Sequence, residues 1–152
     1  MSSEDRWKMK LTAFTDYSLR ALMFLAVHPD RLCTTKEIAE TFQISQNHMV
    51  KVAYQLSKLG YVETQKGKNG GMKLSRPPED LNLGEAIRGL EPDFHLVECF
   101  NRKDDNCRIS SACQFKSVLF EAQSAFLDVL DGYTLAQITE NELDLLAALG
   151  TA

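Results

Sequence analysis

The sequence predicts a mainly α-helical protein with a small β-hairpin wing, arranged as a winged helix-turn-helix followed by one long helix. Three patterns support this fold class. Apolar residues recur at helical spacing in three stretches of residues 12–59, short strands flank a glycine-rich turn in residues 61–74, and residues 115–130 carry an apolar stripe of about five turns. A chain of 152 residues has the length of one domain, or of one small domain with an attached helical segment, which excludes a large multidomain enzyme.

The first two predicted helices have ordinary start and stop signals. Residues 12–27 have the spacing of a mostly buried helix, which ends before Pro29. Residues 36–42 form a shorter helix, and either Thr34 or Thr35 supplies the side-chain oxygen that caps its start. A tight connection then leads into a third helix.

The third predicted helix has the features of a DNA-recognition helix. Ser45 caps its start, residues 46–59 place apolar side chains on one face, and Gly60 stops it. In a helix-turn-helix the first residues of this helix meet base edges in the major groove, where Gln, Asn and Lys bond to bases or phosphates. Each polar residue taken singly is equally well explained as a solvated surface residue, so the prediction depends on the group. The predicted DNA-binding residues are Ser45, Gln46, Asn47, His48 and Lys51.

A basic hairpin follows this helix, as a wing does. Residues 61–64 and 72–74 have the pattern of short strands, and the turn between them is rich in Lys and Gly. A basic turn at this position is suited to contacts with DNA phosphates. The predicted DNA contacts of the wing are Lys66, Lys68, Asn69 and Gly70.

The net charge of −4 hides an asymmetry that is consistent with a DNA-binding first half. Residues 1–78 carry 12 Lys or Arg and 7 Asp or Glu, a net charge of +5, whereas residues 79–152 carry 5 and 14, a net charge of −9. The first part can therefore meet a polyanion that the second part repels. A short helix over residues 83–90 follows the change of sign.

The long helix of residues 115–130 needs a surface to cover its apolar stripe. It ends at Asp131 and Gly132. Either this helix packs back on its own domain, or it pairs with the same helix of a second subunit and sets two recognition helices one DNA turn apart. We favour the homodimer, because a winged helix leaves little free surface to cover the stripe.

Three of the four cysteines, Cys99, Cys107 and Cys113, fall within 15 residues of a loop-like segment. The N-terminus is polar and no apolar run is long enough for a membrane helix, so we expect a cytoplasmic protein with no membrane partner. Disulfides are disfavoured in the reducing cytoplasm. Structural zinc sites often use CxxC pairs, which are missing here, and loosely spaced thiolates suit an iron–sulfur cluster better. Cys33 is predicted to be a small buried hydrophobic residue.

These features together resemble the NsrR-type family of bacterial nitric-oxide-sensing iron–sulfur repressors and, more distantly, their IscR relatives. The resemblance extends from Met9 to about Thr139 and is carried by the runs MKLTAFTDYSLRALMFLA, ISQNHMVKVAYQLSKLGYVETQKGKNGGMKL, LVECF and SAFLDVLDGYTLAQIT. We therefore divide the chain into four segments. These are an N-terminal extension (1–8), a winged helix-turn-helix DNA-binding domain (9–78), a short helix and cluster-binding loop (79–113), and a dimerisation helix with a C-terminal tail (114–152).

The resemblance implies a homodimer that represses genes of nitric oxide detoxification and releases DNA when its [4Fe-4S] cluster is nitrosylated. It implies that Cys99, Cys107 and Cys113 bind the cluster, and that Asp16 in the LTAFTD motif supplies a fourth ligand from the other subunit. Arg20 would then contact that carboxylate. From the residues alone, Asp16 and Arg20 have the i,i+4 spacing of an ordinary ion pair on a helix surface.

The sequence departs from the family pattern in the cysteine loop, where seven residues rather than five separate the first two cysteines. A [2Fe-2S] cluster is therefore an alternative. IscR-like sensors of cluster or redox status have a histidine three residues after the third cysteine, and this chain has Lys116 there, which favours nitric oxide sensing. A zinc-stabilised DNA-binding protein is a third hypothesis, and we expect no enzyme activity because no nucleophile–base pairing or phosphate loop is present. Competing ligands in the loop are His95, Glu98, Asp104 and Asp105.

Overall fold

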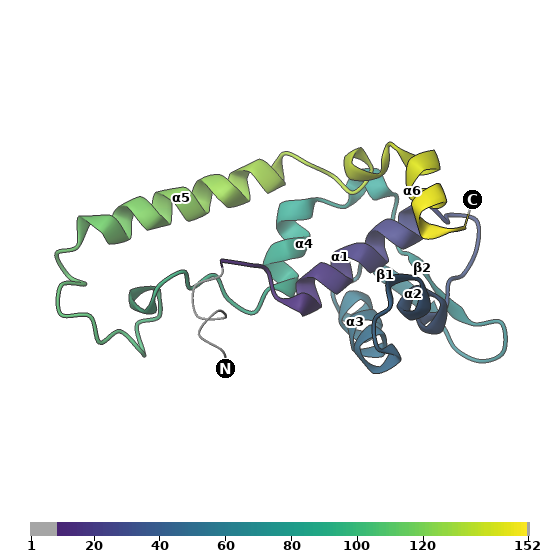
Figure 1. Ribbon diagram of the computed structural model, residues 1–152, viewed down its shortest axis with the longest axis horizontal. Coiled ribbons are helices and arrows are strands. Elements are labelled where there is room, and N and C mark those ends of the chain that lie inside the picture. Colours follow the sequence, from purple (N-terminus) through teal and green to yellow (C-terminus); the bar gives the residue numbers. More distant parts are fainter. Residues whose placement is uncertain (1–8, 152) are drawn as a thin grey trace.

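Five α-helices and a two-stranded hairpin form the body of the described part of the chain, and a long helix extends away from that body (Figure 1). The computed structural model describes residues 9–151, so the proposed extension, residues 1–8, lies outside the described residues. The first elements are α1 (Ala13–Ala26), α2 (Thr35–Phe42), α3 (Gln46–Lys58), β1 (Val62–Gln65) and β2 (Gly71–Leu74). They are followed by α4 (Leu83–Leu90), α5 (Gln114–Asp131) and α6 (Glu142–Leu149). This order confirms the predicted fold class.

Side-chain caps fix the starts of the first four helices. In each case a side-chain oxygen just before the helix accepts the backbone N–H of the residue three positions later, which satisfies a donor that has no partner inside the helix. The capping residues are Thr12, Thr34, Ser45 and Asn82. The prediction of Ser45 is confirmed, and of the two candidates for α2 the cap is Thr34.

Two predicted helices are shorter in the structure than in the sequence analysis. The prediction of a helix over residues 12–27 included Thr12 and Val27, which flank α1 as its two capping residues. The prediction over residues 46–59 likewise included Leu59, which caps the end of α3. Apolar side chains at caps still pack on the core, so periodicity alone extends a helix past its last hydrogen-bonded residue.

The hairpin pairs β1 and β2 in antiparallel register, with Val62 opposite Leu74 and Gln65 opposite Gly71. Both predicted strands, 61–64 and 72–74, differ from the observed ones by one residue. β1 begins after Tyr61, whose ring is buried in the core, and it extends to Gln65, whereas β2 begins at Gly71. Gly70 makes the turn possible, because a Cβ there would lie 2.2 Å from the carbonyl oxygen of Gln65.

Cys33 attaches the hairpin to the body. Its N–H donates to the carbonyl of Met72 (2.9 Å), and the N–H of Met72 donates back to the carbonyl of Cys33 (2.8 Å). The Cys33 side chain is fully buried, and this burial raises the pKa of its thiol. The prediction of a small buried residue is confirmed, and the wing is held at a fixed place beside α1.

One hydrophobic core joins both halves of the sequence. Its most deeply buried side chains come from α1, α2, α3, β2, α4 and the segments that precede α4 and follow α5. Fully buried members include Leu22, Phe24, Ile38, Met49, Leu56, Leu81 and Leu135. The core therefore holds α3 from behind and leaves its opposite face free.

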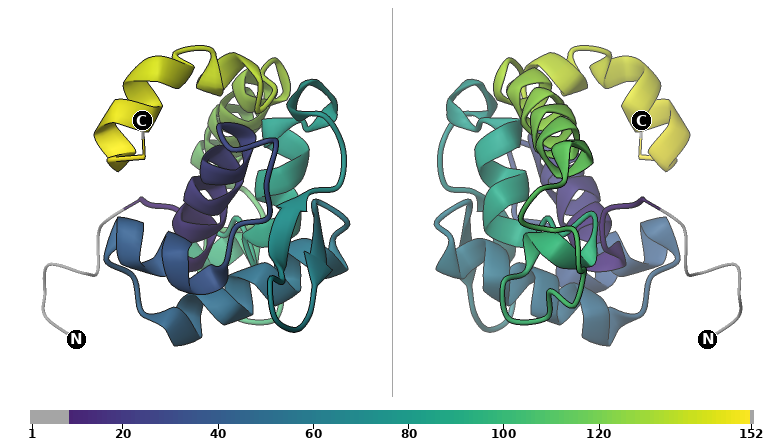
Figure 2. Two further views of the ribbon diagram at one scale, coloured as in Figure 1. Left: turned by 90° about the vertical axis from the view of Figure 1, so that its right-hand side faces the viewer. Right: turned by 90° about the vertical axis from the view of Figure 1, so that its left-hand side faces the viewer.

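The chain returns to the body after α5. Leu135 is fully buried in the core, and Leu149 of α6 packs against it. Figure 2 shows α6 beside α1, on the side of the body away from the hairpin loop. The residues after α5, which the sequence analysis grouped with the dimerisation helix, thus cover α1. Among residues 9–151, none of the helices has the length and apolar character needed to span a membrane.

Candidate functional site

The outer face of α3 carries the polar residues predicted to contact DNA. Met49, Val52 and Leu56 bury the opposite face, so Gln46, Asn47, His48 and Lys51 are exposed together with the cap Ser45. The ring of His48 lies 6.2 Å from the ring of Tyr17 on α1, measured between centroids. The start of α3 is thereby in contact with the first turns of α1.

Two residues on this face were missed by the sequence analysis. Val50 and Tyr54 are 50% and 70% exposed, and they follow Asn47 by three and seven positions, so all three lie on one side of α3. Their position off the buried stripe was the available signal. An exposed valine and tyrosine beside Lys51 give the face apolar surface that suits the methyl group of thymine.

The tip of the wing is exposed and basic. Lys66, Lys68 and Asn69 are exposed and Gly70 is half-buried. Asn69 adopts a left-handed backbone conformation with φ of 66°. Figure 2 shows the hairpin loop on the same side of the body as α3, opposite α6. The structure therefore brings the two predicted DNA-binding groups to one surface.

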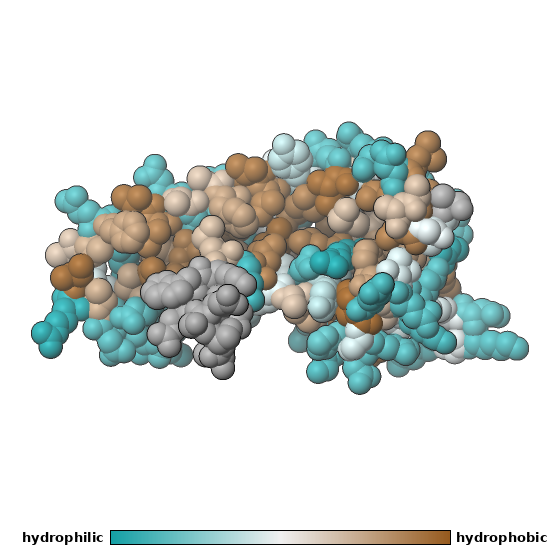
Figure 3. Space-filling view, in the orientation of Figure 1, coloured by the Kyte–Doolittle hydropathy of each residue, from teal (hydrophilic) through white to brown (hydrophobic). Residues whose placement is uncertain are grey.

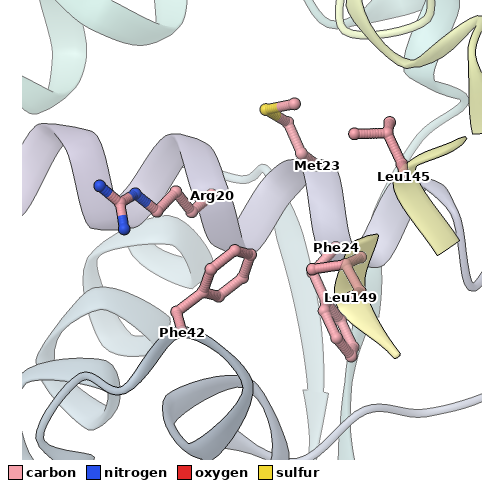
Figure 4. Close-up of a pocket in the computed structure, with 6 residues that line it drawn as sticks. All are labelled: Arg20, Met23, Phe24, Phe42, Leu145 and Leu149. Atoms are coloured by element: carbon pink, nitrogen blue, oxygen red, sulfur yellow. The ribbon is translucent and has the colours of Figure 1, made fainter. Parts of the chain in front are cut away.

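Asp16 and Arg20 form an ion pair on the first turns of α1. The Arg20 Nη2 lies 2.7 Å from Asp16 Oδ2 and its Nε donates to Oδ1 at 3.2 Å, with each side chain a little under half exposed. Arg20 also borders an apolar groove of about 210 Å³ between α1, α2 and α6 (Figure 4). Its guanidinium points along α1, away from Leu145 and Leu149. Within one chain, Asp16 and Arg20 thus form the i,i+4 ion pair that their spacing predicts.

Glu91, at the end of α4, caps the start of α1. Both carboxylate oxygens accept the backbone N–H of Thr12 at 3.2 Å, and the Thr12 hydroxyl donates to Oε2 at 3.2 Å. This contact spans 79 residues of sequence, so no local pattern could have indicated it. It ties the segment that leads into the cysteine loop to the helix turn that precedes Asp16.

The three clustered cysteines lie on the segment that connects α4 to α5. Cys99 is buried in a short 3-10 helix, Cys107 lies half-buried in a turn, and Cys113 immediately precedes α5. All three are free thiols. Within residues 9–151, no three His, Cys, Asp or Glu side chains approach closely enough to hold a metal ion. The donor set nevertheless suits an iron–sulfur cluster, because three thiols sit on one largely irregular loop.

Hydrogen bonds and one aromatic stack order this loop. Asp105 accepts the N–H of Cys107 at 3.1 Å and the hydroxyl of Ser110 at 2.5 Å, and the bond from Ser110 lowers the pKa of the Asp105 carboxyl. Lys116 in turn donates to Ser110 at 3.2 Å. Phe100 stacks on Phe120 of α5 with 4.0 Å between ring centroids. Asp105, one of the competing ligands, thus serves the loop itself.

The other competing ligands also have local roles or lie exposed. Asp104 accepts from the side-chain amide of Asn101 at 2.5 Å. The Nδ1 of His95 lies 3.4 Å from Asp93, and Glu98 is exposed at the start of its 3-10 helix.

The apolar stripe of α5 divides into two faces. Leu119 and Leu130, which the sequence analysis placed in one stripe with the others, are half-buried toward the chain itself, as is Gln123, which donates to the Phe94 carbonyl. The outer face remains exposed, and α5 has no buried residue. Figure 3 shows apolar surface along this helix. The exposed apolar residues of the predicted stripe are Phe115, Val118, Ala122, Ala125, Phe126 and Val129, and Phe120, which lies outside that stripe, is exposed as well.

Comparisons with known proteins agree with a winged-helix transcriptional regulator. Residues 11–141 match the model of the Rrf2 family, described as iron-dependent transcriptional regulators. The HTH-type transcriptional regulator NsrR of Bacillus licheniformis is 54% identical over 135 residues, 88% of this chain and 94% of that protein. NsrR of Bacillus subtilis is 51% identical over 142 residues, 93% and 97% of the two chains. Among solved structures, T. potens IscR superposes with a TM-score of 0.70 at 27% identity over 88% of each chain.

Proposed function

The chain belongs to the Rrf2 family of transcriptional regulators, and we propose that it acts there as a homodimeric repressor that senses nitric oxide through a [4Fe-4S] cluster. Its relatives are named transcriptional regulators, so it is a DNA-binding regulator rather than an enzyme. The observation that carries the sensing proposal is the group of three free thiols on the loop that leads into α5. Its partners would be operator DNA, a second subunit and nitric oxide.

In this proposal α3 lies in the major groove and the wing contacts the backbone beside it. The side-chain amides of Gln46 and Asn47 offer both a donor and an acceptor to an adenine edge, and Lys51 donates to guanine or phosphate. Their exposure on one helix face supports this role. Residues 9–78 are the DNA-binding domain, although α4 completes the core that supports them.

The outer face of α5 supports a symmetric dimer. Phe115, Ala122 and Val129 are seven residues apart, and Val118 and Ala125 fall between them, which is the spacing of a helix–helix seam. The two alanines allow a second helix to approach closely. The same surface from both subunits would bury itself across a two-fold axis. Residues 114–131 are therefore the dimerisation element.

Cys99, Cys107 and Cys113 would hold the cluster on residues 79–113, with Asp16 of the partner subunit as the fourth ligand. When bound, the cluster supplies the iron with which nitric oxide reacts. A carboxylate oxygen is a harder ligand than a thiolate, so Asp16 would be the most readily replaced of the four ligands. Within the single chain, Arg20 holds and orients the Asp16 carboxylate.

A change at Asp16 has a short route to the DNA-binding face. Tyr17 is its neighbour in sequence, and the Tyr17 ring lies beside His48 at the start of α3. α1 and α3 also pack directly against each other. A shift of the first turns of α1 would thus displace the residues of α3 that contact bases, and the half-sites would lose their spacing.

Replacing Asp16 with alanine is expected to change the response to nitric oxide more than the affinity for DNA. Cluster-loaded Asp16→Ala protein should bind its operator almost as wild type does, because Glu91 still holds Thr12 at the start of α1 and no DNA-contacting side chain is lost. In this proposal the first turns of α1 shift only when the cluster itself is nitrosylated. Either the chelator concentration that removes its cluster or the nitric oxide concentration to which the cluster responds should change about tenfold, the size of effect that changes around a bound metal usually have. The measurement is anaerobic absorbance spectroscopy with a nitric oxide titration of the protein–DNA complex.

Asp30→Ala is the control, because it removes an exposed carboxylate from the turn that follows α1. It should leave both the spectrum and the nitric oxide titration unchanged. Identical spectra and titrations for Asp16→Ala and wild type would remove Asp16 from the site.

Replacing Lys66 and Lys68 together is expected to reduce the salt dependence of DNA binding. Each phosphate contact contributes about 0.9 to the slope of log affinity against log salt, so Lys66→Ala with Lys68→Ala should lower the slope by about 1.8. Fluorescence anisotropy at several salt concentrations measures it, with DNA that the protein selects from a random library. The arginine pair Lys66→Arg with Lys68→Arg keeps the charge and should retain the slope. A slope unaltered in the alanine pair would refute the wing contact.

A further inference from the structure

The end of α5 is fastened to the start of α4. Arg88 forms a two-pronged ion pair with Asp131, the last residue of α5, with Nη2 2.8 Å from Oδ2 and Nη1 contacting Oδ1. The amide of Asn82, the cap of α4, donates to the backbone carbonyl of Asp131 at 2.7 Å. Asp131 thus receives side-chain contacts from both ends of α4, from its cap Asn82 and from Arg88 in its last turn.

Backbone bonds continue this junction into the core. The N–H of Leu83 donates to the carbonyl of Tyr133 at 3.0 Å, and the N–H of Leu135 donates to the carbonyl of Leu81 at 2.8 Å. Leu81 and Leu135 are fully buried. The chain just after α5 is therefore held rigidly to the chain just before α4, and α5 extends from this point.

Gly84 is shaped to receive the Asp131 carboxylate. A Cβ at Gly84 would lie 1.8 Å from Asp131 Oδ1. Glycine is a poor helix residue, so its presence in the first turn of α4 requires another reason. The close approach of the carboxylate to the helix backbone is that reason.

The position of Asp131 is unfavourable for the helix that carries it. An acidic side chain in the last turn adds negative charge to the negative end of the helix dipole, and the last turn of α5 contains no basic residue. Arg88 supplies the missing positive charge, and its hydrogen bond lowers the pKa of the Asp131 carboxyl. The two side chains are about 40% exposed, and exposed pairs contribute little to stability. Geometry, rather than stability, is what this contact supplies.

We propose that the Arg88–Asp131 clamp, seated on Gly84, sets the angle of α5 against the DNA-binding body and so sets the spacing between half-sites that the dimer accepts. This inference rests on the proposed dimer through α5. A helix of 18 residues is about 27 Å long, so a tilt of about 10° at the clamp moves its far end by about 5 Å. One base pair rises about 3.4 Å, so such a tilt is enough to change the preferred spacing.

The test compares the spacing preference of three variants with that of the wild type. Asp131→Asn removes the charge with little change in shape. Gly84→Ala keeps both charged side chains and displaces the carboxylate, so it separates geometry from charge. Asp80→Asn is the matched control, because it makes the same chemical change at an exposed residue just before α4. All proteins are used full-length, dimeric and cluster-loaded.

The probe is DNA that the wild type selects from a random library, rebuilt with one or two base pairs added to or removed from the spacer. We expect the wild type and Asp80→Asn to lose about tenfold in affinity for each base pair of altered spacing, the cost typical of one wrong base pair. Asp131→Asn and Gly84→Ala should discriminate less than about threefold, or prefer a different spacer, while their thermal unfolding and dimer mass stay close to wild type.

Two results contradict the inference in distinguishable ways. If the wild type selects a spaced repeat and both variants reproduce its spacer profile, the clamp does not set the spacing and the proposed function stands. If the wild type selects single half-sites without a preferred spacing, the proposed dimer is wrong and the inference falls with it.

Discussion

Cys107→Ser protein is expected to lose the iron–sulfur chromophore and to bind its operator at least about a hundredfold more weakly than the wild type. A serine oxygen is a hard ligand that does not replace a thiolate at a cluster, so a single substitution should leave two soft donors on the loop. Anaerobic reconstitution followed by iron and sulfide analysis measures the first effect. Anisotropy on selected DNA measures the second.

Cys33→Ala is the control for this experiment. Cys33 is buried behind the wing and its backbone, rather than its thiol, makes the contacts to Met72. The variant should therefore keep the cluster and bind DNA. A full chromophore in Cys107→Ser protein would show that this thiol does not hold the cluster.

Placing glutamates on the outer face of α5 is expected to give a monomer. In Val118→Glu with Ala125→Glu, two charges would face two identical charges across the proposed two-fold axis, with no partner in an apolar seam. A monomer binds one half-site and loses the effective concentration that linkage provides, so operator affinity should fall by about 10² to 10⁴. Sedimentation velocity and anisotropy measure the two effects.

Ser117→Glu adds the same charge one residue away from this seam. Residue 117 is exposed and its side chain lies about 100° around the helix from residue 118. This variant should remain dimeric and bind normally. If the double glutamate variant also remained dimeric, the outer face of α5 would not be the interface.

The elements of this fold that follow from local signals could be predicted from the sequence. Ser45 and Gly60 bound α3 because capping and stopping depend on neighbouring residues alone. The strand boundaries shifted at Tyr61 because the core takes up this ring before the ladder begins. The strand propensity of a residue does not report that the core takes up its side chain instead.

Contacts between distant segments could not be predicted in the same way. Glu91 caps α1 across 79 residues, and Arg88 reaches Asp131 across 43. Each looks in the sequence like a solvated charge, and only the packing of α4 gives it a partner. The division of the α5 stripe into an inner and an outer face has the same origin, because helical spacing reports which residues share a side and not what covers them.

Only part of the candidate site could be predicted from the residues alone. The three cysteines stand out by composition, and the polar start of α3 stands out by its position off the buried stripe. Asp16 does not stand out, because its i,i+4 spacing to Arg20 is that of an ordinary ion pair on a helix surface. A ligand supplied across a subunit interface leaves no mark in the spacing of its own helix.

Native mass spectrometry of anaerobically prepared protein would determine whether a dimer of this chain carries a [4Fe-4S] cluster that reacts with nitric oxide. One spectrum reports metal, sulfide and subunit number, before and after stepwise addition of nitric oxide. We predict a dimer with four irons and four sulfides per subunit whose mass rises as nitric oxide is added. A zinc mass, or a [2Fe-2S] mass that nitric oxide leaves unchanged, would contradict the account and assign the winged-helix regulator a different signal.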